Sequence, residues 1–146
     1  MKNYNRYSSR DSVKNYFPMP NNIFCLGLSP GELSVYAYLL FREDRKTYQC
    51  YPSYKTIGNA IGISKNTVKK YIDSLVQKQL ITTEQTQVTL KNGRKRNGNL
   101  RYTIRPIEEA VSFYYDSQIR KFHDEQTRLR IENLLKELSE NRLKSG

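Results

Sequence analysis

The sequence has few of the residues on which metal and redox chemistry depend. Its 146 residues include two cysteines, Cys25 and Cys50, a single histidine, His123, and no tryptophan. Two cysteines are too few for a disulfide framework or for a zinc site of their own. A lone histidine in a charged stretch is typical of a solvent-facing helix. We therefore expect no metal and no cofactor.

Motifs of several enzyme classes are also missing. No glycine-rich phosphate loop ending in Lys-Ser or Lys-Thr occurs, and one histidine cannot form the cluster that metal-assisted strand nicking requires. The 12 tyrosines offer many nucleophiles, but a tyrosine without an activating neighbour is more typical of packing. We predict that the chain is not an enzyme and has no catalytic residues.

Long hydrophobic runs are absent as well. No apolar stretch is long enough to cross a bilayer, and the N-terminus lacks the apolar core of a signal peptide. We therefore expect a soluble, cytoplasmic protein with no membrane partner. The hydrophobic fraction of 37% is low for a fully packed globule, which suggests that part of the chain lies outside a core.

Positive charge is what the sequence has in excess, with a net charge of +11. Residues 1–106 contain 18 lysines and arginines against 6 acidic residues, whereas residues 107–146 contain 7 against 8. The excess therefore belongs to the first part of the chain. It favours a polyanionic partner, although basic surfaces also serve solubility alone.

Residues 1–16 are predicted to form a flexible basic arm, because they contain almost nothing to bury. Aromatic and cationic side chains alternate there, which would allow stacking on bases or contact with phosphates. The alternative is a plain disordered tail. The side chains concerned are Tyr4, Arg6, Tyr7, Arg10 and Lys14.

The motif "LSPGEL" predicts the start of a helix. Ser29 is a candidate N-cap, Pro30 suits the first helical position, and Glu32 would complete a capping box. The apolar spacing that follows predicts a buried face made of Leu33, Tyr36, Ala37 and Leu40.

Two further helices are predicted to meet at Gly62, since glycine tolerates the positive φ of a sharp turn. Ser53 would cap the first, a short helix with Ile57 and Ala60 facing inward. Ser64 would cap the second. Its predicted inward positions recur every three or four residues and are Val68, Tyr71, Ile72, Leu75 and Val76.

Strand patterns come next. After a short strand around Tyr48–Tyr51, β-branched residues over Leu80–Leu90 and alternation over Leu100–Pro106 predict a hairpin. The connecting stretch Lys91–Asn99 contains two Asn-Gly pairs, Asn92-Gly93 and Asn97-Gly98, which are strong turn signals. The hairpin tip would therefore carry four cations: Lys91, Arg94, Lys95 and Arg96.

Residues 107–146 are predicted to form one long helix over Ile107–Leu143, without glycine or proline in the helical stretch. An exposed apolar stripe on such a helix favours a homodimer. The alternatives are packing on the chain's own domain and a linker to a downstream domain. The predicted stripe is Val111, Tyr115, Ile119, Phe122 and Leu129, with Ile131, Leu134, Leu135 and Leu138 on a nearby face.

The order of these elements resembles a bacterial winged helix-turn-helix group. That group occurs in transcription regulators and in the N-terminal domains of plasmid and mobile-element replication initiators. The matching stretches are "LSPGELSVYAYLL", "YPSYKTIGNAIGISKNTVKKYIDSLVQKQLI" and "GNLRYTI". They contain the patterns PS-x-x-TI, G-x-S-x-x-TV and L-x-x-x-x-LI. The resemblance covers residues 17–106 and implies a mainly α fold with a small β-hairpin wing, here followed by a long C-terminal helix.

The resemblance also implies where duplex DNA would bind. A helix fits the major groove, and lysine and asparagine near its N-terminus can read guanine and adenine edges. Polar groups at the start of the preceding helix and cations of the wing can contact phosphates. The alternative is that these side chains only solvate an outward face. The candidate residues are Ser53, Tyr54, Lys55, Ser64, Lys65, Asn66, Thr67, Lys69, Lys70, Lys91, Arg94, Lys95 and Arg96.

The function expected from the sequence is binding of double-stranded DNA, in transcriptional control within a plasmid, phage or conjugative element. One alternative is the origin-binding domain of a replication initiator. Another is a protein-interaction scaffold whose basic face meets an acidic partner. A small-molecule sensor is also compatible with the sequence, but no pocket can be read from it.

Overall fold

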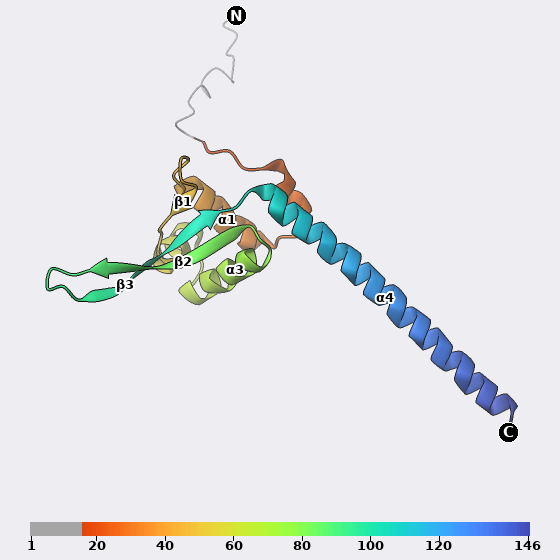
Figure 1. Cartoon of the computed structure of the whole chain (residues 1–146). Coiled ribbons are helices and arrows are strands. Elements are labelled where there is room, and N and C mark those ends of the chain that lie inside the picture. Colours follow the sequence, from red (N-terminus) through yellow and green to blue (C-terminus); the bar gives the residue numbers. More distant parts are fainter. Residues whose placement is uncertain (1–15) are drawn as a thin grey trace, which may run out of the picture. The chain divides into compact units, whose positions relative to one another are not determined.

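A computed structural model describes residues 16–146 (Figure 1). The arm predicted over residues 1–16 lies outside the described residues except for Tyr16. The fold class is confirmed: the structure is mostly helical, with a small antiparallel sheet and a long C-terminal helix. In chain order the elements are η2 (Asn21–Cys25), α1 (Pro30–Arg42), β1 (Gln49–Cys50), α2 (Tyr54–Ile61), α3 (Lys65–Gln77), β2 (Ile81–Thr89), β3 (Lys95–Ile104) and α4 (Ile107–Lys144).

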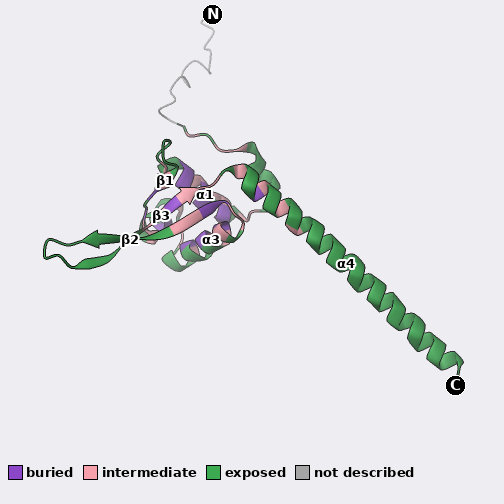
Figure 2. Ribbon diagram, viewed as in Figure 1, coloured by how far each residue is buried: buried purple, intermediate pink, exposed green. Residues whose placement is uncertain are grey.

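The chain separates into two compact units, with the boundary between Ala110 and Val111. The buried side chains all belong to the first unit, where they come from η2, the helices and the sheet (Figure 2). Ala110 is the only buried residue of α4. The core therefore belongs to the first unit, and the largest of its fully buried side chains are Tyr36, Tyr102, Ile23, Leu39, Ile57, Ile72, Leu75, Leu80 and Ile81.

Helix α1 begins as predicted, but its capping box is only half formed. The Ser29 hydroxyl accepts a hydrogen bond from the backbone N–H of Glu32 at 3.2 Å, and Pro30 is the first helical residue. The Glu32 carboxylate does not return to Ser29; it contacts α3 instead. The predicted inward face was also shifted. Leu33 and Ala37 are only half-buried, because α2 and α3 cover the face formed by Val35, Tyr36, Leu39 and Leu40.

The turn between α2 and α3 lies where it was predicted. Gly62 has φ 78°, and Ser53 and Ser64 cap the two helices by accepting from Thr56 and Thr67. Val68, Ile72 and Leu75 are buried, whereas Tyr71 and Val76 are half-buried. The inward placement of Ala60 was wrong: Ala60 is exposed and Gly58 is buried in α2 instead.

Gly58 is buried because the turn folds back onto it. Its carbonyl accepts from the N–H groups of Gly62 and Ile63, at 2.8 and 3.0 Å. A Cβ atom at Gly58 would lie 2.4 Å from the carbonyl oxygen of Ile63. The absence of a side chain is therefore what allows the backbone of the turn to approach the helix so closely.

The sheet has the strand order β1-β3-β2 and is antiparallel throughout. The short strand predicted around Tyr48–Tyr51 is confirmed as β1, which pairs Gln49 with Thr103. The long hairpin joins β2 to β3 and extends away from α1 and α3 (Figure 1). It places four of the cations that make residues 1–106 basic on an element separate from α3: Lys91, Arg94, Lys95 and Arg96.

The hairpin loop is shorter than predicted. Asn92 and Gly93 form the turn: Gly93 has φ 78°, and its N–H donates to Leu90 at 2.9 Å. The second turn signal was wrong, since Asn97 and Gly98 lie within β3. Gly98 is needed there for space, because a Cβ atom would be 2.6 Å from the Thr86 hydroxyl oxygen.

Helix α4 is continuous over 38 residues, as predicted, but its two apolar sets do not share a face. An α-helix turns about 100° per residue, so the nine residues from Leu129 to Leu138 amount to about half a revolution. The prediction of a nearby face was wrong. Val111 to Leu129 forms one stripe, and Ile131 to Leu138 forms another on roughly the opposite side.

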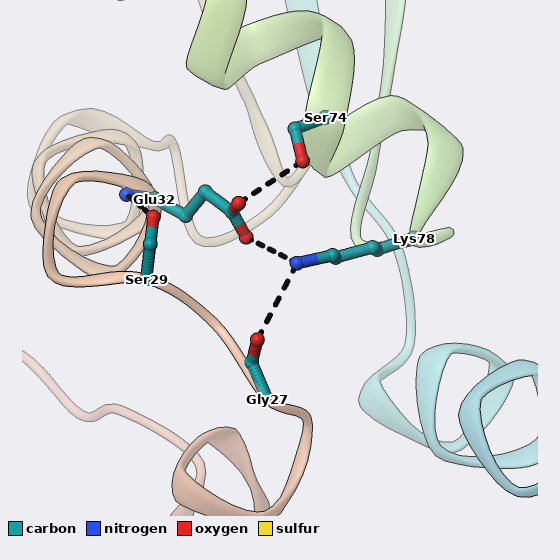
Figure 3. A network of polar contacts seen from close by, with 5 residues as sticks. All are labelled: Gly27, Ser29, Glu32, Ser74 and Lys78. Atoms are coloured by element: carbon teal, nitrogen blue, oxygen red, sulfur yellow. Dashed lines mark hydrogen bonds and ion pairs between the residues drawn. The ribbon is translucent and has the colours of Figure 1, made fainter. Parts of the chain in front are cut away.

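A polar network joins the start of α1 to the end of α3 (Figure 3). The Glu32 side chain is 11% exposed and accepts from Lys78 Nζ at 2.6 Å and from the Ser74 hydroxyl at 3.1 Å. Lys78 Nζ also lies 3.5 Å from the carbonyl oxygen of Gly27. Both carboxylate oxygens are thereby satisfied, which offsets the cost of placing the charge in the interior.

Replacing Lys78 with methionine should destabilise the protein, because the carboxylate of Glu32 would lose its charged partner. The expected loss is about 1–3 kcal/mol in the free energy of unfolding, measured by urea denaturation. Lys55→Met removes the same charge from an exposed site of α2 and serves as the control, with an effect within about 0.5 kcal/mol. Equal effects of the two substitutions would show that the network contributes nothing.

Candidate nucleic-acid interface

The exposed side of α3 is the centre of the candidate interface. Its first two turns present Lys65, Asn66, Lys69 and Lys70 to solvent, while Val68 on the other side is fully buried. The helix cannot rotate to hide these groups, because its apolar stripe is already packed in the core. The outward cations and the asparagine are therefore fixed on one surface.

Unlike Lys65 and Asn66, Ser64 and Thr67 have side chains that form hydrogen bonds at the start of α3. The Ser64 hydroxyl lies 2.9 Å from the Thr67 hydroxyl and accepts from the Thr67 N–H at 3.3 Å. These two hydroxyls are engaged in capping α3, and Thr67 is half-buried. The capping role predicted for Ser64 is confirmed, whereas contacts of either residue with DNA stay predictions.

Lys69 is not a free cation in this structure. Its Nζ lies 2.7 Å from Asp73 Oδ2, one turn further along α3, and both side chains are more than half exposed. The hydrogen bond that Lys69 donates to Asp73 raises the pKa of Lys69, and the negative charge of Asp73 acts in the same direction. Lys65 and Lys70 have no ion pair within residues 16–146. Asp73 therefore lowers the net positive charge of this face.

The start of α2 lies next to this part of α3. Burial raises the pKa of the Tyr54 hydroxyl, and the charge of Asp73 raises it further while Lys69 lowers it. Tyr54, Lys69 and Asp73 are thus close enough to influence one another. Lys55 is exposed beside them, and the Ser53 hydroxyl caps α2 through Thr56. The structure therefore brings Tyr54 of α2 close to Lys69 of α3.

The wing cations lie on the hairpin, and all four are exposed. Lys91 and Arg94 belong to the turn, whereas Lys95 and Arg96 begin β3, opposite Thr89 and Val88. Successive strand residues point to opposite faces, so Lys95 and Arg96 cannot both face the same surface. The four cations consequently surround the hairpin end rather than forming a single patch.

Three residues that bear on the interface were not anticipated from the sequence. Gly58 shapes the turn, Asp73 pairs with Lys69, and Arg101 pairs with Glu84 across β2 and β3. The i,i+4 spacing of Lys69 and Asp73 was a readable signal for an ion pair. The Arg101 contact depends on strand register, which the misplaced second turn obscured.

Comparison with protein families identifies the segment that contains α2, the turn and α3. Residues 26–81 match a family model described as a helix-turn-helix domain. The matched segment runs from just before α1 to the first residue of β2 and so contains α1, α2 and α3. With the hairpin that follows, this helix-turn-helix domain is winged.

The solved structures to which this chain is similar include three proteins from archaea and bacteria. A possible transcriptional regulator from Methanosarcina mazei is 18% identical, with a TM-score of 0.45, over 72% of this chain and 82% of its own. The YusO protein of Bacillus subtilis is 18% identical, with a TM-score of 0.36, over 82% and 79%. A MarR-like transcriptional regulator of Thermotoga maritima is 20% identical, with a TM-score of 0.40, over 92% and 85%. No curated protein sequence matches significantly.

Two searches of the described residues were negative. No helix within residues 16–146 combines the length and apolarity needed to span a bilayer. In the same part of the chain, no group of three or more histidine, cysteine, aspartate or glutamate side chains is arranged to hold a metal ion.

Replacing Gly58 with alanine should destabilise the helix-turn-helix domain by about 1–3 kcal/mol, because the new Cβ would overlap the backbone oxygen of Ile63. At an exposed position inside a helix, replacing glycine with alanine stabilises by about 0.5–1 kcal/mol. A loss of stability at Gly58 would therefore indicate the close contact with Ile63. Thermal and urea unfolding would measure it. Asn59→Ala, at the exposed neighbouring position, is the control and should be close to neutral. A gain in stability for Gly58→Ala would contradict the close contact.

Proposed function

We propose that this chain binds duplex DNA without catalysing a reaction, with α3 in the major groove. The observation that carries the proposal is the fixed exposure of Lys65, Asn66 and Lys70 at the start of α3 in a helix-turn-helix domain. The N-terminal part of such a helix is the part that reaches base edges. Asn66 can pair with adenine through two hydrogen bonds, and the lysines can donate to guanine.

Phosphate contacts are assigned to cations on either side of this helix. Lys55 is exposed at the start of α2, beside the outward face of α3, and the hairpin carries Lys91, Arg94, Lys95 and Arg96. Because these four surround the hairpin end, some would face DNA and others would stay in solvent. Phosphate contacts of this kind fix position and affinity but carry no sequence information.

Asp73 fits this proposal as a built-in competitor. A phosphate that approaches Lys69 must displace the carboxylate that now lies 2.7 Å from its Nζ. The exposed ion pair contributes little to folding, so the exchange costs little. Lys69 is accordingly assigned a phosphate contact that forms only when DNA is bound.

The biological role that we propose is regulation of transcription in a plasmid, phage or conjugative element. Support comes from the helix-turn-helix domain and from the resemblance of its motifs to those of such regulators. Sites selected from random duplexes would separate this role from replication initiation. Promoter operators are expected for the first, and arrays of direct repeats for the second.

DNA titrations at several salt concentrations test the proposal, because each neutralised phosphate releases counterions. The slope of log K against log salt should be about −0.9 per contact, with several contacts in total. Asn66→Ala should weaken the selected site by about 1–3 kcal/mol and leave other duplexes unaffected. The triple substitution of Arg94, Lys95 and Arg96 by alanine should weaken all duplexes alike and flatten the slope.

The controls follow from the same surface. Lys136→Ala removes one positive charge from exposed α4 and should change neither affinity nor slope beyond the small effect of net charge. An affinity independent of salt would exclude DNA as the partner. If Asn66→Ala retained the full site preference, Asn66 would not read a base.

We further propose that the chain forms a homodimer through α4. Tyr115, Ile119 and Phe122 are each more than half exposed, at 55%, 55% and 59%, and lie on one stripe with Leu129. Exposed apolar stripes of this length favour a partner, and a second copy of the same helix presents the same surface. Two α3 helices would then meet half-sites about 34 Å apart, or a multiple of that distance.

Sedimentation equilibrium should show a dimer of the full chain at micromolar concentration. Ile119→Asp with Phe122→Asp should dissociate it, because two charges would enter the proposed interface. Leu134→Asp with Leu138→Asp changes the opposite face of the same helix and should leave the dimer intact. A wild-type chain that is monomeric both free and on DNA would refute dimerisation.

A further inference from the structure

A cavity in the first unit lies apart from α3 and from the turn of the hairpin. It has a volume of about 530 Å³ and lies between the segment before η2, the end of α1 and the end of β3. Its walls include Met19, Pro20, Leu40 and Ile104, so most of the lining is apolar. Pockets of about 300–1,000 Å³ with apolar walls and few polar groups are typical of small-molecule sites.

Glu43 provides the polar group of this cavity. It is the residue that ends α1, and its backbone N–H bonds to the Leu39 carbonyl at 2.9 Å. The carboxylate oxygen Oε2 is buried and has no hydrogen-bond partner among the described residues. A buried acceptor without a partner is costly, so a donor that reached it would be strongly favoured.

The charges around Glu43 leave its carboxylate uncompensated. Burial raises the pKa of Glu43, and the charge of Arg45 lowers it by less. Arg105 also lines the cavity, but its guanidinium is already bound to Glu109 and Gln79. Tyr36, another wall residue, has a pKa raised to about 12, first by burial and then by the charge of Glu43. Its hydroxyl therefore stays neutral.

We propose that this cavity binds a small apolar amine. The ammonium group pairs with the carboxylate of Glu43, and the aryl or alkyl part contacts Met19, Leu40 and Ile104. An amine fits better than an alcohol because it supplies charge as well as a donor. A carboxylic acid of the same shape is excluded by repulsion from Glu43. The proposal does not depend on DNA binding.

The test uses the full chain and three probes of one shape: 4-phenylbutylamine, 4-phenylbutan-1-ol and 4-phenylbutyric acid. Calorimetry should give saturable binding of the amine at millimolar concentration, with the alcohol about tenfold weaker or more, as expected for a charge-assisted bond. The acid should not bind. Methyl NMR should locate the amine, with shifts at Leu40 and Ile104 and none at Val68 on α3.

Two substitutions separate a specific site from general affinity. Glu43→Gln should retain the melting temperature, since it removes a charge that burial disfavours, and should lower amine affinity about tenfold. Met19→Trp should block binding of both the amine and the alcohol by filling the cavity. Glu108→Gln makes the same charge change one residue beyond the lining residue Ile107 and should bind the amine normally.

Three outcomes would overturn the assignment. One is the absence of saturable amine binding to the wild-type chain. Another is equal binding of the amine and the acid, and the third is unchanged amine affinity in Glu43→Gln. DNA titrations of the same variants are independent, so failure here would leave the proposed function intact, and failure of DNA binding would leave this site intact.

Discussion

The placement of α3 is the constraint on which the rest of the first unit depends. Val68, Ile72 and Leu75 hold its inner side in the core, and their burial decides which residues face outward. At its start, the turn approaches Gly58 too closely to allow a side chain. At its end, Lys78 is bound to the buried carboxylate of Glu32. A helix held at three places can present Lys65 and Asn66 with a defined orientation, as recognition of base edges requires.

Stability and recognition are assigned to different charges in this domain. Lys78 is partly buried and paired with Glu32, so it contributes to the stability of the fold. Lys65 and Lys70 are exposed and have no ion pair in residues 16–146. Exposed charges add little to stability, but their summed potential increases the rate at which an anionic partner is met. Asp73 moderates that potential at one position. The surface can therefore be altered by substitution with little risk to the fold.

The features predicted best from the sequence are those that depend on residues close together in the chain. Ser29, Ser53 and Ser64 cap their helices as expected, because a cap depends on residues only three positions apart. Gly58 and Gly98 were not recognised, since the reason for each glycine is an atom from another segment. The outward positions of Lys65, Asn66 and Lys70 followed from the cap and spacing of α3, whereas their contacts with DNA stay predictions. The cavity beside Glu43 was not predictable, because its walls come together only through tertiary packing.

The strand order β1-β3-β2 leaves β2 with a neighbour on one side only, within the part of the chain that the structure describes. Open edges of this kind invite pairing with other molecules and, at high concentration, aggregation. The ladder between β2 and β3 shifts in register between Gln85 and Gln87, and the extra residue of this bulge lies in β3. A bulge of this kind increases the local twist of the strand pair, so the open edge of β2 is less flat than a passing strand would need. The bulge thus protects a long, protruding hairpin from joining the sheets of neighbouring copies.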